Sequence, residues 1–380
     1  MNNAITVSPV ECLSQRRQFI DCLHTIYSDD PYWIPPLTLE RHLHFSRFNP
    51  FFKHGKWKTW LAYSDGRPVG RISAQVDRLH RGHYGIKSGH FGLFEAIEDE
   101  VVAAALFQAA ESWLRSEGTE VITGPFNLSI NQESGLLVDG FDTPPVLMMP
   151  HGRRWYDSMV RSQGYTVARD LYAYWITADQ FKNPPAVLTL QRRYGSKVKL
   201  RPFNRRRFQQ ELMIIRDIFN DGWTDNWGHV PMTIAEINDL GAALRFFIPD
   251  DLICIAEIDD KPVAFMVFMP NLNESFAKTQ GSLFPRGIFT LIGDIRKKRI
   301  KTGRVPLMGV RKQYHNSPLG IALAFMVVNA VVKFASTQLG MEGAEISWIL
   351  EDNKGMMNML DSIGSQRYKT YRVYEKRLSA

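Results

Sequence analysis

The sequence predicts an α/β (α+β) protein made of two similar domains, each with a central sheet flanked by helices. The chain has 380 residues, which is more than one hydrophobic core usually serves. Short β-branched and aromatic segments alternate with segments of helical period, which indicates strands and helices in mixed order. In addition, the two halves repeat short motifs in the same order.

The repeat appears at three places with nearly constant spacing. IPPLTLE in the first half matches HVPMTIAE in the second, DGRPVG matches DDKPVA, and the segment from Met159 matches the segment from Met359. Three matches in one order favour a duplication. We therefore expect one domain at residues 1–178 and another at 190–380, joined by the polar segment that contains Pro-Pro.

The segment EISWILEDNKGMMNMLDSIG illustrates the order of elements. Residues 346–350 have the composition of a strand, and Met356, Met359 and Leu360 begin a helical period. Asn353 can cap this helix and Gly364 can end it. A strand that leads directly into a helix leaves a crevice where ligands often bind.

Composition limits the partners. The net charge of +7 and the pI near 9.2 favour an anionic partner such as nucleic acid, a phosphate-bearing cofactor or a lipid surface. The densest basic run, Arg296 to Arg304, contains no aromatic residues, so nucleic acid is an unfavoured partner and a solvated face is expected. Three cysteines without paired spacing and histidines without an H-E-x-x-H pattern predict no metal site.

The N-terminus shows no signal pattern, and the longest apolar stretch, which starts at Pro318, is interrupted by Asn329 and Lys333. We expect this stretch to be a buried core helix and the protein to be cytoplasmic.

The second half resembles the GNAT (Gcn5-related N-acetyltransferase) superfamily, and the first half repeats it. DDKPVAFMVF is similar to the second and third strands of that family, LMGVRKQYHNSPLGIAL to its fourth strand and pyrophosphate-binding helix, and EDNKGMMNMLDSIG to its fifth strand and following helix. The resemblance implies a mixed, largely antiparallel twisted sheet in each domain. It also implies that the fourth and fifth strands splay to admit the pantetheine arm of acyl-coenzyme A.

The family's phosphate motif, R/Q-x-x-G-x-G/A, falls on residues 315–320, where only Gly320 fits strictly and Pro318 occupies a glycine position. A helix N-terminus favours phosphate through its free N–H groups and its dipole. The resemblance implies these cofactor-binding residues: Gly309, Val310, Arg311, His315, Asn316, Ser317, Leu319, Gly320 and Asn353. An acyl carrier protein is an alternative donor. The equivalent segment of the first half, FEAIEDE, is acidic and would repel a pyrophosphate.

More narrowly, HFGLFEAIED, GPFNLSINQESGLLVDGFDTPPVLMMPH and GWTDNWGHVP resemble a bacterial group of tandem GNAT-like proteins that includes the bacterial ceramide synthases and uncharacterised relatives. This resemblance runs along nearly the whole chain. It implies transfer of a long-chain acyl group from acyl-coenzyme A to the amine of a sphingoid base or a related amino-lipid.

Acyl transfer to an amine needs a base, a polarised carbonyl and a proton for the thiolate. Candidate catalytic bases are Glu351 at the crevice, His229 in a loop, and Glu133 in the GPFN segment. Each has a structural alternative as a cap, a packed loop residue or a brace. Many GNAT enzymes carry an acid tyrosine where this chain has Leu360, so the proton donor is unassigned, with Tyr314 and Tyr368 as candidates.

Two segments are candidates for substrate contact. The first follows a predicted helix and contains Trp223, Asn226 and Trp227, an aromatic wall with polar groups. The second is a long, glycine-punctuated insertion that either lines a site or braces the two halves. Its polar candidates are Asn127, Asn131, Asp139 and Asp142.

The segment from Leu283 places Phe284, Ile288, Leu291 and Ile295 on one helical face before the basic run. Such a helix either packs in the core or lies on the anionic inner membrane as a peripheral contact. Two further functions stay open: aminoacyl transfer from tRNA, since peptidoglycan-building aminoacyltransferases also pair two GNAT-like domains, and a non-catalytic scaffold that binds acyl groups or lipids.

Overall fold

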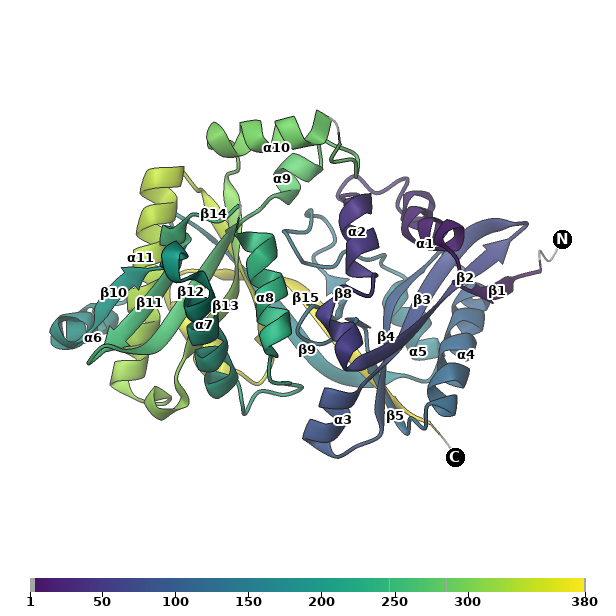
Figure 1. Ribbon diagram of the computed structural model, residues 1–380, viewed down its shortest axis with the longest axis horizontal. Coiled ribbons are helices and arrows are strands. Elements are labelled where there is room, and N and C mark those ends of the chain that lie inside the picture. The colour runs from purple at the N-terminus through teal and green to yellow at the C-terminus, as the bar shows by residue number, and fades with distance from the viewer. Residues whose placement is uncertain (1–3, 246, 285, 379–380) are drawn as a thin grey trace. The chain divides into compact units, whose positions relative to one another are not determined.

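The computed structural model describes residues 4–245, 247–284 and 286–378 (Figure 1). Contacts divide the chain into two compact units. The first unit runs through Leu171 and also contains Phe276–Phe289 and the chain from Lys369 onward. The second unit contains Tyr172–Ser275 and Thr290–Tyr368.

In the first unit, consecutive strands form a sheet in the order β1-β2-β3-β4-β5, followed by the part of β15 that belongs to this unit. The strands are β1 (Thr6–Pro9), β2 (Gly55–Ser64), β3 (Arg67–Asp77), β4 (Ser88–Ala96), β5 (Val121–Gly124), β6 (Phe126–Asn127), β7 (Glu133–Ser134), β8 (Leu136–Asp139) and β15 (Gln366–Arg377). The β4–β5 pair is parallel, whereas β1 to β4 are antiparallel. β8 and β5 both pair with β15, and β6 pairs separately with β7.

Helix α4 covers this sheet because its apolar side recurs at helical spacing, and Val102, Leu106 and Phe107 are buried there with β2 and β3 residues. Asp99 caps α4 by accepting from the Val101 N–H at 2.8 Å. The helices of the unit are α1 (Leu13–Ile26), α2 (Thr38–His44), α3 (Arg78–Tyr84), α4 (Glu100–Ser116) and α5 (Tyr156–Ser162).

In the second unit, the sheet has the order β9-β14-β13-β12-β11-β10. The strands are β9 (Thr166–Thr177), of which the part from Tyr172 belongs here, β10 (Lys199–Pro202), β11 (Ile253–Ile258), β12 (Lys261–Pro270), β13 (Thr302–Val310) and β14 (Gly343–Leu350). β13 and β14 are parallel, and β10 to β13 are antiparallel. Both sheets are therefore mixed and largely antiparallel, as predicted.

The helices of the second unit are α6 (Pro185–Tyr194), α7 (Phe208–Gly222), α8 (Ile234–Leu244), α9 (Asn273–Phe276), α10 (Arg286–Arg296), α11 (Pro318–Leu339) and α12 (Lys354–Ser362), although α9 and α10 reach into the first unit's segment. α7 packs on β12 and β13, and α11 packs on β11 and β12. By length and composition α11 could cross a membrane. Its buried side chains, among them Leu323, Phe325 and Val327, instead make it the core helix that the sequence predicts.

Local sequence features account for several of these elements. Thr233 and Glu236 exchange hydrogen bonds as a capping box at the start of α8, with Thr233 N–H donating to Glu236 at 2.7 Å. Asp259 and Asp260 both adopt positive φ, 50° and 56°, in the two-residue turn that joins β11 to β12. The predicted strand-to-helix segment forms β14 and α12.

The face predicted for the helix from Leu283 is partly wrong. Leu291 is buried, as expected for that face. Phe284 instead precedes α10 and is 59% exposed. Phe289, which was not predicted to lie on that face, is 73% exposed. The basic run also differs from prediction at its end: residues 296–299 are exposed, whereas Arg304 lies inside β13 and is buried. A charged residue enters a strand interior only with a partner.

Candidate functional site

The central feature of the second unit is a parting of two parallel strands. β13 and β14 pair over four residue pairs, from Thr302–Gly343 to Val305–Ile346. Both strands continue beyond this point, and β13 stays paired with β12 as far as Val310. Within the described chain, the facing edges of β13 and β14 therefore stop bonding to each other after Val305. N–H groups on those edges can pair with an extended ligand, whereas the carbonyls of Met308 and Val310 already have side-chain partners.

The backbone of β13 alternates between β12 and this opening. Arg311 N–H donates to Val263 O at 2.9 Å, so it faces β12. Met308 O instead accepts from the Trp223 indole N–H at 3.0 Å and faces the opening. By alternation, Val310 also faces the opening and Gly309 faces β12. Of the predicted cofactor-binding residues Gly309, Val310 and Arg311, only Val310 points its N–H to the opening, and Met308 N–H, which was not predicted, points there as well.

Helix α11 begins immediately after β13. Ser317 is its N-cap, and its hydroxyl accepts from Gly320 N–H at 3.0 Å. Pro318 has no N–H, and Ile321 N–H donates to Ser317 O, which leaves Leu319 N–H as the open donor of the first turn. A Cβ at Gly320 would lie 2.1 Å from Tyr314 O, so the turn requires glycine there.

Two basic side chains stand beside this turn in ion pairs. Arg311 Nη2 lies 2.7 Å from Asp217, and Lys312 Nζ lies 2.7 Å from Asp225. The Lys312 pair is exposed, so this cation can exchange its carboxylate for a phosphate at small cost, whereas Arg311 is 27% exposed and also donates to Pro262 O at 2.9 Å. The His315 ring nitrogen Nε2 hydrogen-bonds Val310 O at 2.8 Å. Asn316 adopts a positive φ in the turn before the cap. The residues present fit a phosphopantetheine group through one N–H, the helix dipole and these two cations.

A buried ion pair lies where the strands part. Arg304 and Glu345 face each other one residue pair before the last, and their side chains are 1% and 0% exposed. Arg304 Nε donates to Ser347 Oγ at 3.0 Å and lies 3.6 Å from Glu345. The Ser347 and Tyr368 hydroxyls both donate to Glu345. This group was not predicted, although a glutamate within an alternating apolar strand is itself a signal.

The turn after β14 holds two predicted site residues. Glu351 is partly buried at the carboxyl end of the strand. Asn353 caps α12, with its side-chain oxygen accepting from Met356 N–H at 3.0 Å. The side-chain oxygen of Asn353 is thus used within the fold.

Replacing Asn353 by alanine is expected to reduce the free energy of unfolding by about 1 kcal/mol, because α12 loses its cap. Replacement by serine, which can also cap, should restore most of it. Urea unfolding of the three proteins checks this. Equal stability of the alanine variant and the parent chain would contradict the assigned cap.

The loop after α7 forms an aromatic wall. Trp223 ends the helix and its ring lies 4.8 Å from that of Phe219, which in turn lies 5.7 Å from His229. Asn226 and His229 continue the turn through backbone hydrogen bonds. His229 is 5% exposed, and Trp227 is partly buried in the same loop. The bond from Trp223 to Met308 brings this predicted substrate segment to the open edge of β13.

Comparisons with known proteins show the family to which the chain belongs. No family model matches the sequence. The bacterial ceramide synthase of Caulobacter vibrioides (strain NA1000 / CB15N) is 42% identical over 381 residues, covering 99% of this chain and 98% of the relative. Protein YghO of Escherichia coli (strain K12) is 48% identical over 363 residues, covering 95% of this chain and 93% of the relative. The chain belongs to the bacterial ceramide synthase family.

Solved structures show the fold of this family member. A tandem GNAT protein from the clavulanic acid biosynthesis pathway superimposes with a TM-score of 0.60 at 11% identity, covering 99% of both chains. A GCN5-related N-acetyltransferase from Sphaerobacter thermophilus gives 0.54 at 12% identity, covering 99% of this chain and 97% of that one. The fold is therefore a tandem of GNAT-like domains, as the resemblance implied.

In the first GNAT-like unit the corresponding opening is filled by the chain itself. β4 and β5 pair from Ser88–Val121 to His90–Thr123. Beyond that point Leu93 N–H donates to the Asn127 side chain at 2.8 Å. A Cβ at Gly92 would lie 2.0 Å from Phe126 O, which shows how closely β6 approaches β4. The side chain of Asn127 thus pairs with the edge of β4 beyond the β4–β5 ladder.

Glu133 is an ion-pair residue of this first unit. It accepts from Arg41 Nη2 at 2.7 Å and from Asn127 Nδ2 at 2.8 Å. Burial alone would raise the pKa of the Glu133 carboxyl, but the Arg41 charge and these hydrogen bonds hold it at about 2. Asn131 lies partly buried in the same segment, whereas Asp139 and Asp142 are exposed. The structure therefore brings Asn127 and Glu133 together and leaves the two aspartates on the surface.

Replacing Glu133 by glutamine is expected to lower the free energy of unfolding by on the order of 2 kcal/mol at pH 6. Because the folded pKa lies below the unfolded value, this contribution is present above about pH 4.5 and is lost as the pH falls toward 2. Urea unfolding of both proteins at pH 6 and pH 3 checks whether the difference in the free energy of unfolding becomes smaller at the lower pH. The same change at Glu120, which is 63% exposed in its pair with Lys87, is the control and should have little effect. A Glu133 effect that grows on acidification would contradict the assignment.

Proposed function

We propose that this protein is an N-acyltransferase that moves a long-chain acyl group from acyl-CoA to the amine of a sphingoid base or a related amino-lipid. The parting of β13 from β14 after Val305 carries this proposal. It is supported by the relative named bacterial ceramide synthase and by the tandem GNAT fold. The pantetheine arm would lie along the Met308 and Val310 edge, with its phosphates at the α11 N-terminus.

In the proposed reaction, the neutral amine attacks the thioester carbonyl, the C–N bond forms and the C–S bond breaks. The amine loses one proton and the departing thiolate gains one. We propose that one of the two N–H groups, that of Met308 or that of Val310, donates to the carbonyl oxygen as its charge develops, and that the other pairs with the pantetheine arm, since groups two residues apart on a strand cannot reach one oxygen. Glu351 and His229 remain the candidate bases. A carboxyl with a pKa near 2 is a poor proton acceptor, so we propose that Glu133 orders Asn127 and Arg41.

The two domains would then have different roles. The second domain would hold the donor, and the first, whose opening Asn127 fills, would bind no cofactor. The acceptor would contact the aromatic wall of Trp223, Asn226 and Trp227. We place the enzyme in the cytoplasm, with a peripheral contact to the anionic inner membrane through exposed Phe289 and Ile292, because Leu291 of the predicted face is buried.

Incubation of the purified protein with palmitoyl-CoA and a panel of amines, followed by mass detection of amides, tests the function. We expect an N-acyl product with sphinganine or 3-oxosphinganine and release of free CoA. Absence of amide with every amine, while palmitoyl-CoA still stabilises the protein against heat, would overturn the transfer reaction and favour a binding scaffold. Stabilisation by tRNA alone would favour aminoacyl transfer.

One observation favours a second donor. The first turn of α11 offers Leu319 N–H as its open donor. One N–H group satisfies few of the oxygens of the CoA pyrophosphate. An acyl carrier protein presents one phosphate on the same pantetheine arm. Competition between palmitoyl-CoA and a palmitoylated carrier protein in the amide assay separates the two donors by their kcat/KM values.

A further inference from the structure

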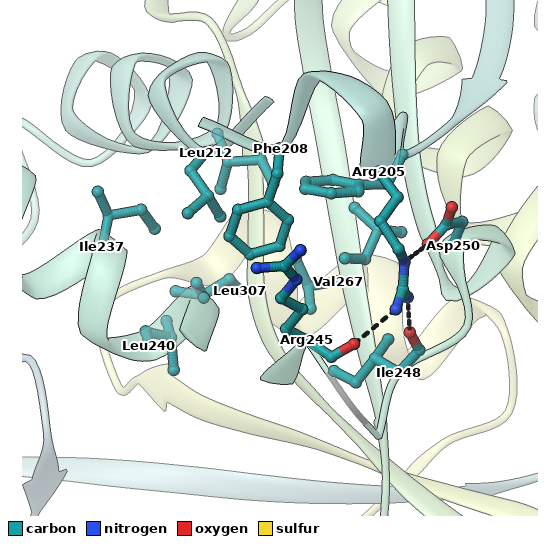
Figure 2. A pocket seen from close by; sticks show the side chains of 14 residues that line it. Arg205, Phe208, Leu212, Ile237, Leu240, Arg245, Ile248, Asp250, Val267 and Leu307 are labelled. Carbon is teal, nitrogen blue, oxygen red and sulfur yellow. Dashed lines mark hydrogen bonds and ion pairs between the residues drawn. The ribbon is translucent and has the colours of Figure 1, made fainter. Parts of the chain in front are cut away.

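The second unit contains an apolar pocket whose lining includes none of the candidate catalytic residues. It lies between α7, α8 and the sheet and is open to solvent at its mouth. Figure 2 shows Leu212 and Phe208 of α7, Ile237 and Leu240 of α8, and Val267 and Leu307 of the sheet around it. The other lining residues are Phe203, Arg205, Ile215, Gly241, Arg245, Ile248, Asp250 and Ile253.

The charged groups of the pocket stand at one side. Arg205 is fixed by Asp250 at 2.7 Å and by the carbonyls of Arg245 and Ile248, both at 2.6 Å. The Arg245 guanidinium lies 5.2 Å from the centre of the Phe208 ring, as Figure 2 shows. The remaining wall is almost entirely hydrocarbon. A ligand with a long apolar chain matches this lining, whereas a cationic headgroup beside the two guanidinium groups is disfavoured.

One wall residue connects the pocket to the parted strands. Leu307 pairs with Val267 across β13 and β12, and it lies two residues beyond Val305, where β13 and β14 stop bonding. A chain attached to a thioester beside Met308 therefore starts next to this wall. Gly241 allows the two helices to pack closely beside the pocket. A Cβ at this position would lie 2.5 Å from Leu212, so the lack of a side chain lets α8 approach α7.

We propose that this pocket binds the hydrocarbon chain of the acyl donor and sets the chain length that the enzyme accepts. The inference rests on the proposed function, since it assumes a long-chain acyl thioester in the opening. The acyl chain enters beside Leu307 and runs between α7 and α8 toward Phe208. The amine-bearing acceptor binds elsewhere, because the guanidinium groups of Arg205 and Arg245 repel its charge.

The first test narrows the pocket. Leu240→Trp places a larger side chain in the wall, while Ile234→Trp makes a similar change on the same helix at a side chain that is 55% exposed and outside the lining. We expect Leu240→Trp to lower kcat/KM for a 16-carbon acyl-CoA at least about tenfold relative to a 4-carbon one. Ile234→Trp should leave this ratio unchanged. An unchanged ratio in a folded Leu240→Trp protein overturns the inference.

The second test does not depend on turnover. A 16-carbon acyl-CoA with a diazirine at the end of its chain is photolysed on the parent protein, and the labelled peptides are identified by mass spectrometry. Labels on α7 or α8 within residues 208–245 support the proposal. Labels confined to other segments overturn it, even if amide formation proceeds normally. If no donor yields amide but α7 and α8 are labelled, the proposed reaction fails and the pocket assignment stands.

Discussion

Replacing Glu345 by alanine is expected to lower the free energy of unfolding by roughly 3–5 kcal/mol. The change removes the carboxylate that faces the Arg304 guanidinium, and both side chains are almost fully buried. It also removes the acceptor of the Ser347 and Tyr368 hydroxyls. Urea unfolding followed by tryptophan fluorescence is the measurement, since Arg304 lies 4.6 Å from the centre of the Trp348 ring.

A double variant tests whether charge burial is the cause. Arg304→Met combined with Glu345→Leu removes both charges at similar volume, and such exchanges are often neutral or stabilising. We expect it to be clearly more stable than the single alanine variant. A loss below about 1 kcal/mol for Glu345→Ala would contradict a buried ion pair at this position.

Replacing Gly320 by alanine is expected to weaken donor binding at least about tenfold, because the new Cβ would lie 2.1 Å from Tyr314 O and the turn into α11 must move. This turn aims Leu319 N–H and the helix dipole at the proposed phosphate site. Titration calorimetry with palmitoyl-CoA measures the effect. Gly355→Ala is the matched control in the first turn of α12, where the nearest heavy atom is 3.9 Å away. Equal affinity of the Gly320 variant and the control would contradict the assigned phosphate site.

Features that depend on neighbouring residues could be predicted from the sequence. The change of period after Leu350 predicts β14 and α12, and Asn353 caps α12 as expected. Gly320 is the one residue that fits the phosphate motif strictly. The structure shows why glycine is needed there, because a Cβ would lie 2.1 Å from Tyr314 O. In each case the physical cause acts within one turn of chain, so a local pattern records it.

Features that depend on partners far apart in the chain could not be predicted from the sequence. Arg304 looked like the end of a basic surface run, and its partner lies on a strand after the next helix. Likewise Arg41, which sets the pKa of Glu133, lies 92 residues before it. The register of β13 with β12 determines which backbone groups of β13 face the opening. The sequence therefore could not show that Val310 faces the opening while Gly309 and Arg311 face β12.

Amide hydrogen exchange with and without a non-hydrolysable palmitoyl-CoA analogue tests most directly whether the parted strands hold the donor. Bound donor should slow exchange at the N–H groups of Met308 and Val310. Gly309 and Arg311, which face β12, should be unaffected. If the analogue raises the melting temperature while exchange at Met308 and Val310 stays the same, the donor binds elsewhere and the account is contradicted.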